Sequence, residues 1–235
     1  MNASVSPLIL YIETGSDICS VILSSGNSLL AIKESDNSRA HAQLLSVFID
    51  EIIKENKLNY SDLNAIAVSK GPGSYTGLRI GVATAKGICF GLAIPLIAID
   101  SLLSLTRIYL QKYAGETDVI YCPMIDARRM EVYTALFDKN TRRIGDTRAL
   151  IVDENSFAGV LENNKMVFFG DGAEKCKDVI KHPNAVFADA IRLSAMGMVD
   201  EATQLYQNKQ FEDVAYFEPF YLKDFVVTQS EKKVL

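Results

Sequence analysis

Three short apolar segments lie near the start of the chain, at residues 8–12, 18–24 and 29–33. They are rich in leucine, isoleucine and valine, and small polar residues at 15–16 and 25–27 separate them. Short apolar runs bounded by glycine, serine and asparagine are typical of β-strands joined by tight turns. The pattern therefore predicts that a meander of three strands opens the fold.

From residue 41 onward the apolar positions recur at intervals of three and four. This stripe consists of His41, Leu44, Leu45, Phe48 and Ile52. Such spacing predicts an amphipathic helix from His41 to about Glu55. A short apolar strand at 66–68, a second helix and another strand at 96–99 are predicted to follow.

The most specific stretch of the chain is KGPGSYTGLRIG, residues 70–81, which joins the strand at 66–68 to the second helix. Glycines on both sides of a proline allow a sharp turn at this point. Either Ser74 or Thr76 can cap the helix that follows. We therefore expect a strand, a tight turn and a helix in direct succession.

One face of this second helix carries mainly small residues. At 3.6 residues per turn the face contains Gly77, Gly81, Thr84, Ala85, Ile88 and Gly91. Each glycine lowers the stability of a helix by about 0.5–1 kcal/mol relative to alanine. A stripe of glycines therefore indicates that some close contact requires them. Either another helix docks closely on it, or the helix packs closely on its own sheet. A phosphate-binding turn is a third possibility, but the glycine spacing fits neither the dinucleotide motif nor the P-loop.

The opening of the chain has a second copy. Residues 10–23 can be laid over residues 123–136 without a gap, which places Ile12 on Ile125 and Glu13 on Asp126. Each copy has an apolar strand, a terminal carboxylate, a tight turn and a returning strand. The duplication predicts an α/β fold of two lobes, each a mixed sheet flanked by helices, as in actin-like (ASKHA) phosphotransferases. We place the N-terminal lobe at 1–107 and a smaller, divergent C-terminal lobe at 108–235.

The pattern is looser in the second half. A third strand is predicted near 147–152, a helix at 154–161 and a strand at 166–169, after which a glycine turn leads into another helix. Residues 191–206 are predicted to form the last long helix. Residues 217–227 are aromatic and are predicted to be extended.

Composition narrows the possible functions. The 235 residues carry a net charge of -5, which disfavours a surface that grips nucleic acid on its own, because phosphate contacts need clustered Lys and Arg. The longest apolar run, residues 88–99, is too short to span a bilayer, so we expect no membrane association. The four cysteines are widely spaced, and the first residues lack the features of a signal peptide. These features predict reduced thiols and a cytoplasmic protein.

In actin-like folds an acidic residue ends the first strand of each lobe and helps to hold a metal nucleotide. Here Glu13 and Thr14 fit this role in the first lobe, and Asp126 is the corresponding acid in the second. The turn at 127–129 lacks the glycine that would bring backbone donors close to a phosphate. We therefore expect a vestigial nucleotide cleft with at most weak ATP or ADP binding and no required cofactor. For Asp126, a structural role in capping this turn is equally open.

Four motifs together resemble one known family. They are KGPGSYTGLRIG, IDARRMEVY at 125–133, GDGAEK at 170–175 and EPFYLKD at 218–224. They resemble the TsaB family of tRNA threonylcarbamoyladenosine biosynthesis proteins, noncatalytic paralogues of TsaD. The resemblance implies a scaffold or activator subunit that binds TsaD and, with the ATPase TsaE, supports threonylcarbamoylation of the adenosine 3′ of the anticodon in tRNAs reading ANN codons. It implies only indirect contact with the tRNA.

The family uses its first two helices to form a four-helix bundle with TsaD. On this chain the resemblance places the partner contacts at His41, Leu44, Leu45, Phe48, Gly77, Gly81, Thr84, Ala85 and Ile88. Because such a face would be exposed without the partner, we also expect the isolated chain to form a homodimer through it.

The catalytic relatives carry a His-x-x-x-His metal site after the strand that follows the glycine-rich helix. This chain has Ser101 and Leu105 there, and neither can replace an imidazole ligand. His41 and His182 are far apart in the sequence, so we expect no metal and no catalytic residue. Two other functions stay open: an actin-like small-molecule kinase or ATPase that uses the two strand-end carboxylates, and a metalloprotease, which the missing histidine pair makes the weaker of the two.

Overall fold

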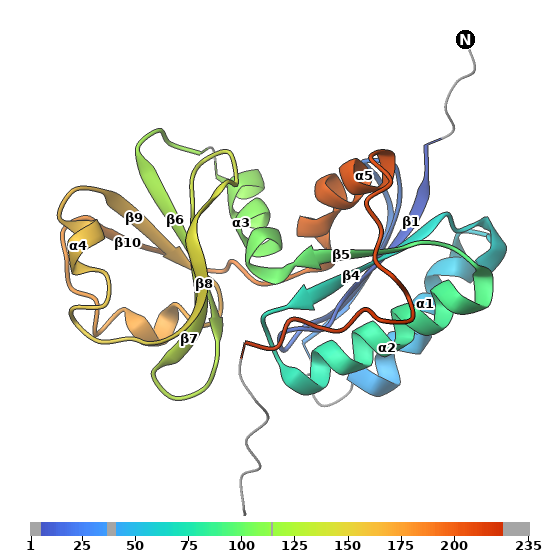
Figure 1. Ribbon diagram of the computed structural model, residues 1–235, viewed down its shortest axis with the longest axis horizontal. Coiled ribbons are helices and arrows are strands. Elements are labelled where there is room, and N and C mark those ends of the chain that lie inside the picture. Colours follow the sequence, from blue (N-terminus) through green and yellow to red (C-terminus); the bar gives the residue numbers. More distant parts are fainter. Residues whose placement is uncertain (1–5, 37–40, 114, 223–235) are drawn as a thin grey trace, which may run out of the picture.

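A computed structural model describes residues 6–36, 41–113 and 115–222. They form two five-stranded mixed sheets, each flanked by helices, and the two lobes lie beside one another with α3 (Ser101–Lys112) between them (Figure 1). The predicted two-lobed α/β fold is confirmed. No helix in the described part of the chain is both long and apolar enough to cross a membrane.

The first sheet contains the predicted meander and two further strands. Its members are β1 (Leu8–Glu13), β2 (Cys19–Ser25), β3 (Ser28–Ser35), β4 (Ala65–Gly71) and β5 (Leu96–Asp100). The spatial order is β3-β2-β1-β4-β5, with β1 antiparallel to β2 and parallel to β4. Since β4 and β5 are also parallel, the carboxyl ends of β1, β4 and β5 meet at one end of the sheet.

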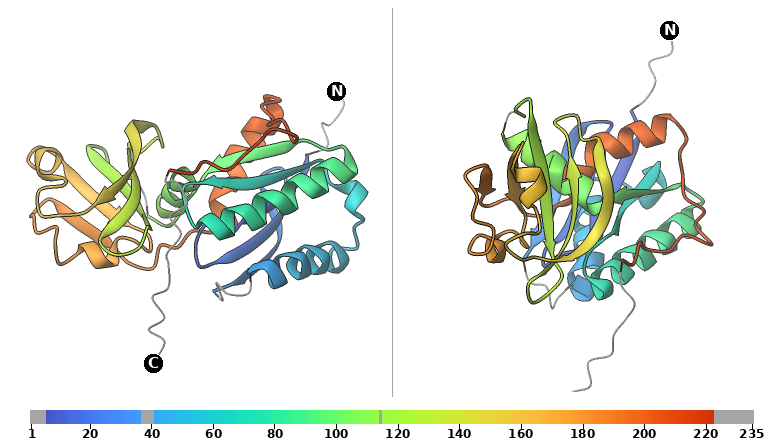
Figure 2. Two further views of the ribbon diagram at one scale, coloured as in Figure 1. Left: turned by 60° about the horizontal axis from the view of Figure 1, so that its bottom comes forward. Right: turned by 60° about the vertical axis from the view of Figure 1, so that its left-hand side comes forward.

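Helices cover both faces of this sheet. On one face α1 (His41–Glu55) and α2 (Tyr75–Leu92) lie side by side, and the short η2 (Tyr60–Asp62) precedes β4 (Figure 2). On the other face lie η4 (Ala195–Met198) and α5 (Val199–Gln207). Ser74 caps α2, since its hydroxyl accepts a hydrogen bond from the backbone N–H of Gly77.

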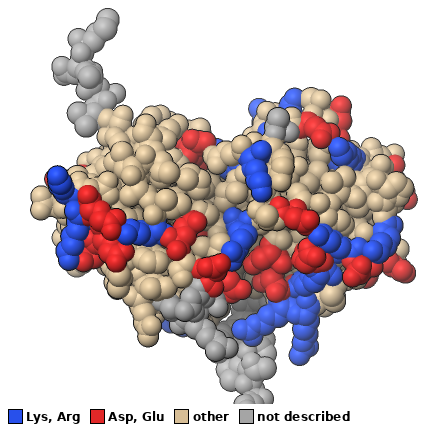
Figure 3. Space-filling view, turned by 180° about the vertical axis from the view of Figure 1, so that it is seen from behind, with Lys and Arg blue, Asp and Glu red and all other residues tan. Residues whose placement is uncertain are grey.

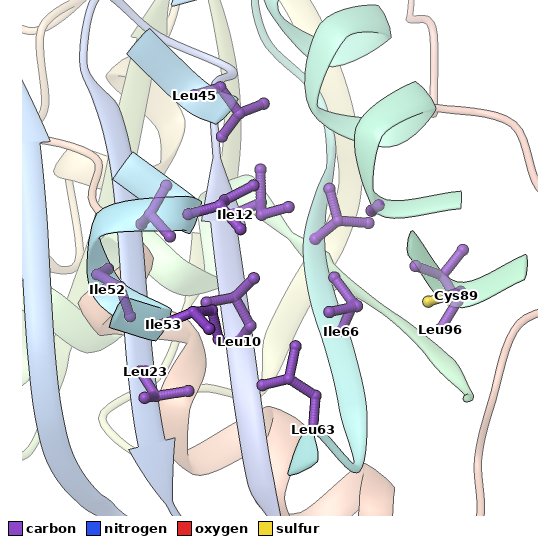
Figure 4. Close-up of a cluster of buried hydrophobic side chains, with 14 of the residues drawn as sticks. Leu10, Ile12, Leu23, Leu45, Ile52, Ile53, Leu63, Ile66, Cys89 and Leu96 are labelled. Atoms are coloured by element: carbon purple, nitrogen blue, oxygen red, sulfur yellow. The ribbon is translucent and has the colours of Figure 1, made fainter. Parts of the chain in front are cut away.

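The core beneath α1 and α2 is made of aliphatic side chains from both layers. Leu10, Ile12 and Ile66 of the sheet pack with Leu45 and Ile52 of α1, and all five are fully or almost fully buried (Figure 4). Burial of one such side chain stabilises the fold by about 1.5–3 kcal/mol. This cluster fixes the helices on the sheet and therefore determines which sides of them face outward.

The second sheet repeats the plan of the first. Its strands are β6 (Val119–Asp126), β7 (Glu131–Phe137), β8 (Arg143–Ile151), β9 (Lys165–Phe169) and β10 (Ala185–Ala188), in the order β10-β9-β6-β7-β8. Glu13 and Asp126 end the corresponding first strands, as the internal repeat predicts. Glu13 pairs with Ser20 and Asp126 with Val132, so the second turn is shorter by one residue.

The helices of the second half are shorter than predicted. The predicted helix at 154–161 is reduced to α4 (Ala158–Leu161), because Asp153 accepts hydrogen bonds from the N–H of Asn155 and the hydroxyl of Ser156 and so holds a turn before it. The turn at 170–172 leads only to the single-turn η3 (Glu174–Cys176).

The prediction of one long helix over 191–206 is wrong in its first part. Ile191 and Leu193 are not helical and are buried in the core of the second lobe. Ser194 then caps η4, since its hydroxyl accepts the N–H of Met196, and the helices η4 and α5 begin only there. The chain crosses from the core of the second lobe to that of the first at this point.

The end of the described chain returns to the first lobe. The predicted lobe boundary after residue 107 falls within α3, and α5 packs on the first sheet. Residues 209–222, which we call the strap, continue from α5 across β5 and α2 (Figure 1). The prediction of an extended segment agrees with the structure for 217–222, and 223–227 lie outside the described residues.

Hydrogen bonds fix the strap at three points. The N–H of Glu212 donates to the carbonyl of Leu96 (2.9 Å), and the N–H of Phe220 donates to the carbonyl of Lys70 (2.7 Å). Between these points, the ammonium of Lys86 donates to two strap carbonyls, at 2.8 and 3.3 Å. The strap is therefore attached to β4, β5 and α2 together.

Candidate functional site

The small-residue stripe that begins at Gly77 faces the chain's own sheet. The hydroxyl of Thr14, just after β1, donates to the carbonyl of Gly77 (2.8 Å). A Cβ atom at Gly77 would lie 1.9 Å from the Thr14 carbonyl oxygen, and one at Gly81 would lie 2.3 Å from the Thr14 hydroxyl. Ala85 is fully buried on the same side. The prediction that these three residues form a docking face therefore does not hold, and close packing within the chain accounts for them.

Two of the predicted contacts on α1 are also inside the lobe. Leu45 belongs to the core, and His41 is 5% exposed. The Nε2 atom of His41 lies 3.2 Å from the carbonyl oxygen of Asp17 in the β1–β2 turn. His41 therefore holds this turn in place and offers little surface to a partner.

The half-buried residues Leu44 and Phe48 face the outer edge of the first sheet. They share one row of α1 with Glu51 and Glu55, at spacings of three and four. Both glutamates pair with Lys33 of β3, at 3.1 and 2.7 Å. Since β3 is an edge strand and α2 lies on the other side of α1, this row is directed away from α2.

The outward side of α2 carries a row of small residues, of which the predicted stripe included only Gly91. Ala83, Gly87 and Gly91 are exposed and follow one another at intervals of four. A Cβ atom added at Gly87 or Gly91 would have no neighbour within 4 Å. Nothing within the described chain therefore requires glycine at these positions.

The exposed sides of α1 and α2 together form one surface, which we call the docking surface. Its residues are Ala42, Ser46 and Val47 of α1 and Ala83, Thr84, Gly87, Ile88 and Gly91 of α2. Most are small, and Val47 is 46% exposed. Small side chains let the axes of two packed helices approach closely. Of the predicted contacts, Thr84 and Ile88 belong to this surface.

The predicted nucleotide cleft is closed in the first lobe. The N–H of Ser74 donates to the carbonyl of Gly15 (2.7 Å), and a Cβ atom at Gly73 would lie 2.3 Å from the same oxygen. Thr14 lies beneath Gly77, as described above. The turn that should receive phosphates is thus packed under the start of α2.

The side chain of Glu13 is shielded from solvent beside the same turn. It is fully buried, its Oε1 accepts the N–H of Gly15 (2.6 Å), and its Oε2 has no partner in the described part of the chain. Burial raises the pKa of Glu13 to about 7, although hydrogen bonds from Gly15 and Ser69 act in the opposite direction. A buried carboxyl that stays partly protonated at neutral pH is a poor ligand for magnesium.

Asp126 of the second lobe has a structural role. Its Oδ1 accepts the N–H of Arg128 (2.7 Å) and the ammonium of Lys175 (2.5 Å), which is the capping role that the sequence left open. Arg128 and Arg129 have φ values of 72° and 51°, in the left-handed region that favours glycine. Glu13, Thr14 and Asp126 therefore do not fit a magnesium nucleotide in this arrangement.

Ser101 and Leu105, at the positions of the missing histidine pair, make contacts within the protein. The hydroxyl of Ser101 lies 2.7 Å from that of Ser69, and Leu105 is buried in the second lobe. Within residues 6–36, 41–113 and 115–222, no three His, Cys, Asp or Glu side chains lie close enough to hold a metal ion.

Known proteins resemble this chain over most of its length. The family model of TsaD, tRNA N6-adenosine threonylcarbamoyltransferase, matches residues 32–229. The tRNA threonylcarbamoyladenosine biosynthesis protein TsaB of Escherichia coli (strain K12) is 30% identical over 222 residues, which are 92% of this chain and 94% of that protein. The TsaB protein of Bacillus subtilis (strain 168) is 33% identical over 129 residues, 55% of this chain and 54% of that protein.

Solved structures agree with the fold. YeaZ from Pseudomonas aeruginosa superposes with a TM-score of 0.79 at 24% identity and covers 92% of this chain and 100% of its own. The ethanolamine utilization protein EutJ from Carboxydothermus hydrogenoformans reaches a TM-score of 0.50 at 12% identity, over 85% of this chain and 91% of its own. The extent of the sequence matches establishes the relationship: this chain belongs to the TsaB family.

Proposed function

We propose that this chain is a noncatalytic subunit that takes part in tRNA threonylcarbamoyladenosine biosynthesis by binding a TsaD-type protein through its docking surface. The names of its relatives support the pathway. The observation that carries the interface is the exposed stripe of Ala83, Gly87 and Gly91, where glycine weakens the helix and serves no contact within the described chain. A helix of the partner that packs closely on this stripe would account for it.

In this proposal the chain acts through its partner and does no chemistry itself. The closed turn at Gly15 and the pairing of Asp126 with Lys175 support the absence of catalysis. TsaE joins a larger complex, and the tRNA is contacted only indirectly. On the face shown in Figure 3, basic and acidic side chains are intermixed, and no continuous basic area is present for a phosphate backbone.

The interface can be tested with two matched glycine variants. Gly87→Leu places a large side chain on the docking surface, and Gly159→Leu places the same side chain on exposed α4 of the other lobe, where a Cβ atom also has no neighbour within 4 Å. Titration with the TsaD protein of the same organism should show an affinity at least about 100-fold lower for Gly87→Leu, which corresponds to about 2.7 kcal/mol. Gly159→Leu should bind like the wild type. Equal affinity of both variants would refute the assignment.

The same surface should mediate self-association of the isolated chain. A dimer would bury the exposed apolar and small residues of α1 and α2 that the partner otherwise covers. Light scattering at tens of micromolar should therefore report a dimer for the wild type and a monomer for Gly87→Leu. Addition of the TsaD protein should dissociate the dimer. A dimer that persists in Gly87→Leu would place self-association elsewhere.

The competing function is an actin-like kinase or ATPase active on its own, which the two strand-end carboxylates favour. The burial of Glu13 and the pairing of Asp126 with Lys175 argue against it. Calorimetry with millimolar magnesium ATP and the isolated chain separates the two. We expect no saturable heat of binding, whereas stoichiometric binding would favour the kinase or ATPase.

A further inference from the structure

Two aromatic side chains project into solvent beside the outward side of α2. Phe90 of α2 and Tyr216 of the strap are each 84% exposed, more than any other large apolar residue in the described ranges. Aromatic rings are common where two proteins meet, because a ring buries a large area at a small cost in conformational entropy. Both rings are therefore candidates for contact with another protein.

Phe90 borders the docking surface. At 3.6 residues per turn it lies, around the axis of α2, between Lys86 and Gly87. Lys86 faces the strap, to which it donates two hydrogen bonds, whereas Gly87 belongs to the docking surface. A helix is about 10–12 Å wide with its side chains, so a helix that packs on the row of Ala83 and Gly87 also covers the neighbouring row that contains Phe90.

The strap holds Tyr216 beside the same helix, along which it runs in Figure 1. The ammonium of Lys86 donates to the carbonyls of Ala215 (3.3 Å) and Phe217 (2.8 Å), which flank Tyr216 in the sequence. The Oδ1 atom of Asp213 accepts the N–H groups of Ala215 (2.8 Å) and Tyr216 (3.3 Å). Tyr216 is thus the outward residue of a turn that is fixed to α2.

The neighbours of Tyr216 in this turn anchor it from the inside. Val214 and Phe217 pack against the core beneath α1 and α2. The N–H of Phe217 also donates to the carbonyl of Asp213 (2.8 Å), which closes the turn. Since the backbone is already ordered, contact of another protein with Tyr216 loses little further conformational entropy.

We propose that the strap is part of the surface that binds the TsaD-type partner, with Phe90 and Tyr216 as its apolar anchors. The partner presents an apolar recess beside the helix that packs on Ala83 and Gly87, and the two rings fill this recess. Aromatic side chains that enter a pocket of the partner are frequent hot spots of protein interfaces. The inference rests on the function proposed above, because it assigns further contacts to the same partner.

Four variants test the inference by titration with the TsaD protein of the same organism, at concentrations where light scattering reports monomers. Phe90→Ala and Tyr216→Ala should each bind at least about 30-fold more weakly than the wild type. Tyr216→Phe keeps the ring and should bind like the wild type. Ile151→Ala removes a side chain that is 70% exposed on β8 of the second lobe, and should also bind like the wild type.

Wild-type affinity in Phe90→Ala or in Tyr216→Ala would overturn the inference, and Gly87→Leu measured beside them shows which idea has failed. If Gly87→Leu alone loses affinity, the docking surface binds the partner and the two rings lie outside the contact. If Gly87→Leu also binds like the wild type, the proposed function fails together with the inference. Loss of the homodimer in Phe90→Ala with unchanged affinity for TsaD would mean that a second copy of the chain covers the rings instead.

Discussion

Replacement of Gly77 by alanine should lower the free energy of unfolding by about 3 kcal/mol, although alanine is the better helix former by about 1 kcal/mol. The added methyl group would lie 1.9 Å from the backbone carbonyl oxygen of Thr14, so α2 would have to move away from β1. The backbone of Thr14, directly after the central strand β1, cannot shift as a flexible side chain can. Urea unfolding followed by circular dichroism measures the loss.

The matched control is the same substitution ten residues further along the helix. At Gly87 the new methyl group meets no atom within 4 Å, and Gly87→Ala should therefore raise the free energy of unfolding by about 0.5–1 kcal/mol. The two variants differ only in the side of α2 that they modify. Changes of the same sign in both would mean that the contrast between a packed Gly77 and a solvent-facing Gly87 is wrong. Gly81→Leu, in contrast, would disturb the fold and cannot report on partner binding alone.

Glu13→Gln should make the free energy of unfolding less dependent on pH, because it removes a buried carboxyl group whose ionisation destabilises the fold. Because burial raises the pKa of Glu13 in the folded chain to about 7, from its ordinary value of 4.5, the folded state holds the proton more tightly than the unfolded state does. The contribution to stability is therefore complete below pH 4.5 and is lost as the pH rises toward 7. The difference in unfolding free energy between wild type and Glu13→Gln should change by about 2.5 kcal/mol from about pH 5 to about pH 8, in favour of the variant.

The glutamine amide suits this site because its oxygen can accept the N–H of Gly15 and its NH₂ group can donate to the hydroxyl of Ser69. Chemical unfolding of both proteins at several pH values measures the effect. The exposed variant Glu218→Gln controls for the loss of a carboxylate as such. Parallel profiles for wild type and Glu13→Gln would show that the buried carboxyl does not ionise differently in the folded chain.

The first lobe could be predicted from the sequence because its signals are local. Short apolar runs, turn residues and the Ser74 cap each act within a few positions, and the structure reproduces β1 to β5, α1 and α2. The prediction failed in one respect, namely which side of α2 faces outward. Leu78, Val82 and Cys89 lie next to the Gly77 stripe, and together they form one broad buried face. The predicted stripe joined the buried Gly77, Gly81 and Ala85 with Gly91, which is exposed together with Ala83 and Gly87.

The second half could be predicted less well because its elements depend on distant contacts. Ile191 and Leu193 have helical spacing with later residues, yet the core of the second lobe buries them in a nonhelical segment. The strap is held by the carbonyls of Leu96 and Lys70, which lie far away in the sequence, and no local pattern records such contacts. The roles of Glu13 and Asp126 likewise depend on which groups the fold brings beside them.

The return of α5 to the first sheet also has a consequence for synthesis on the ribosome. The face formed by Ile9, Tyr11 and Ile97 is covered by Met198 and Ala202. A nascent chain that has emerged only as far as α3 would still expose this apolar face to water. Stable closure of the first lobe must therefore wait until residue 207 has left the exit tunnel, so the second lobe has the opportunity to fold earlier although it is made later.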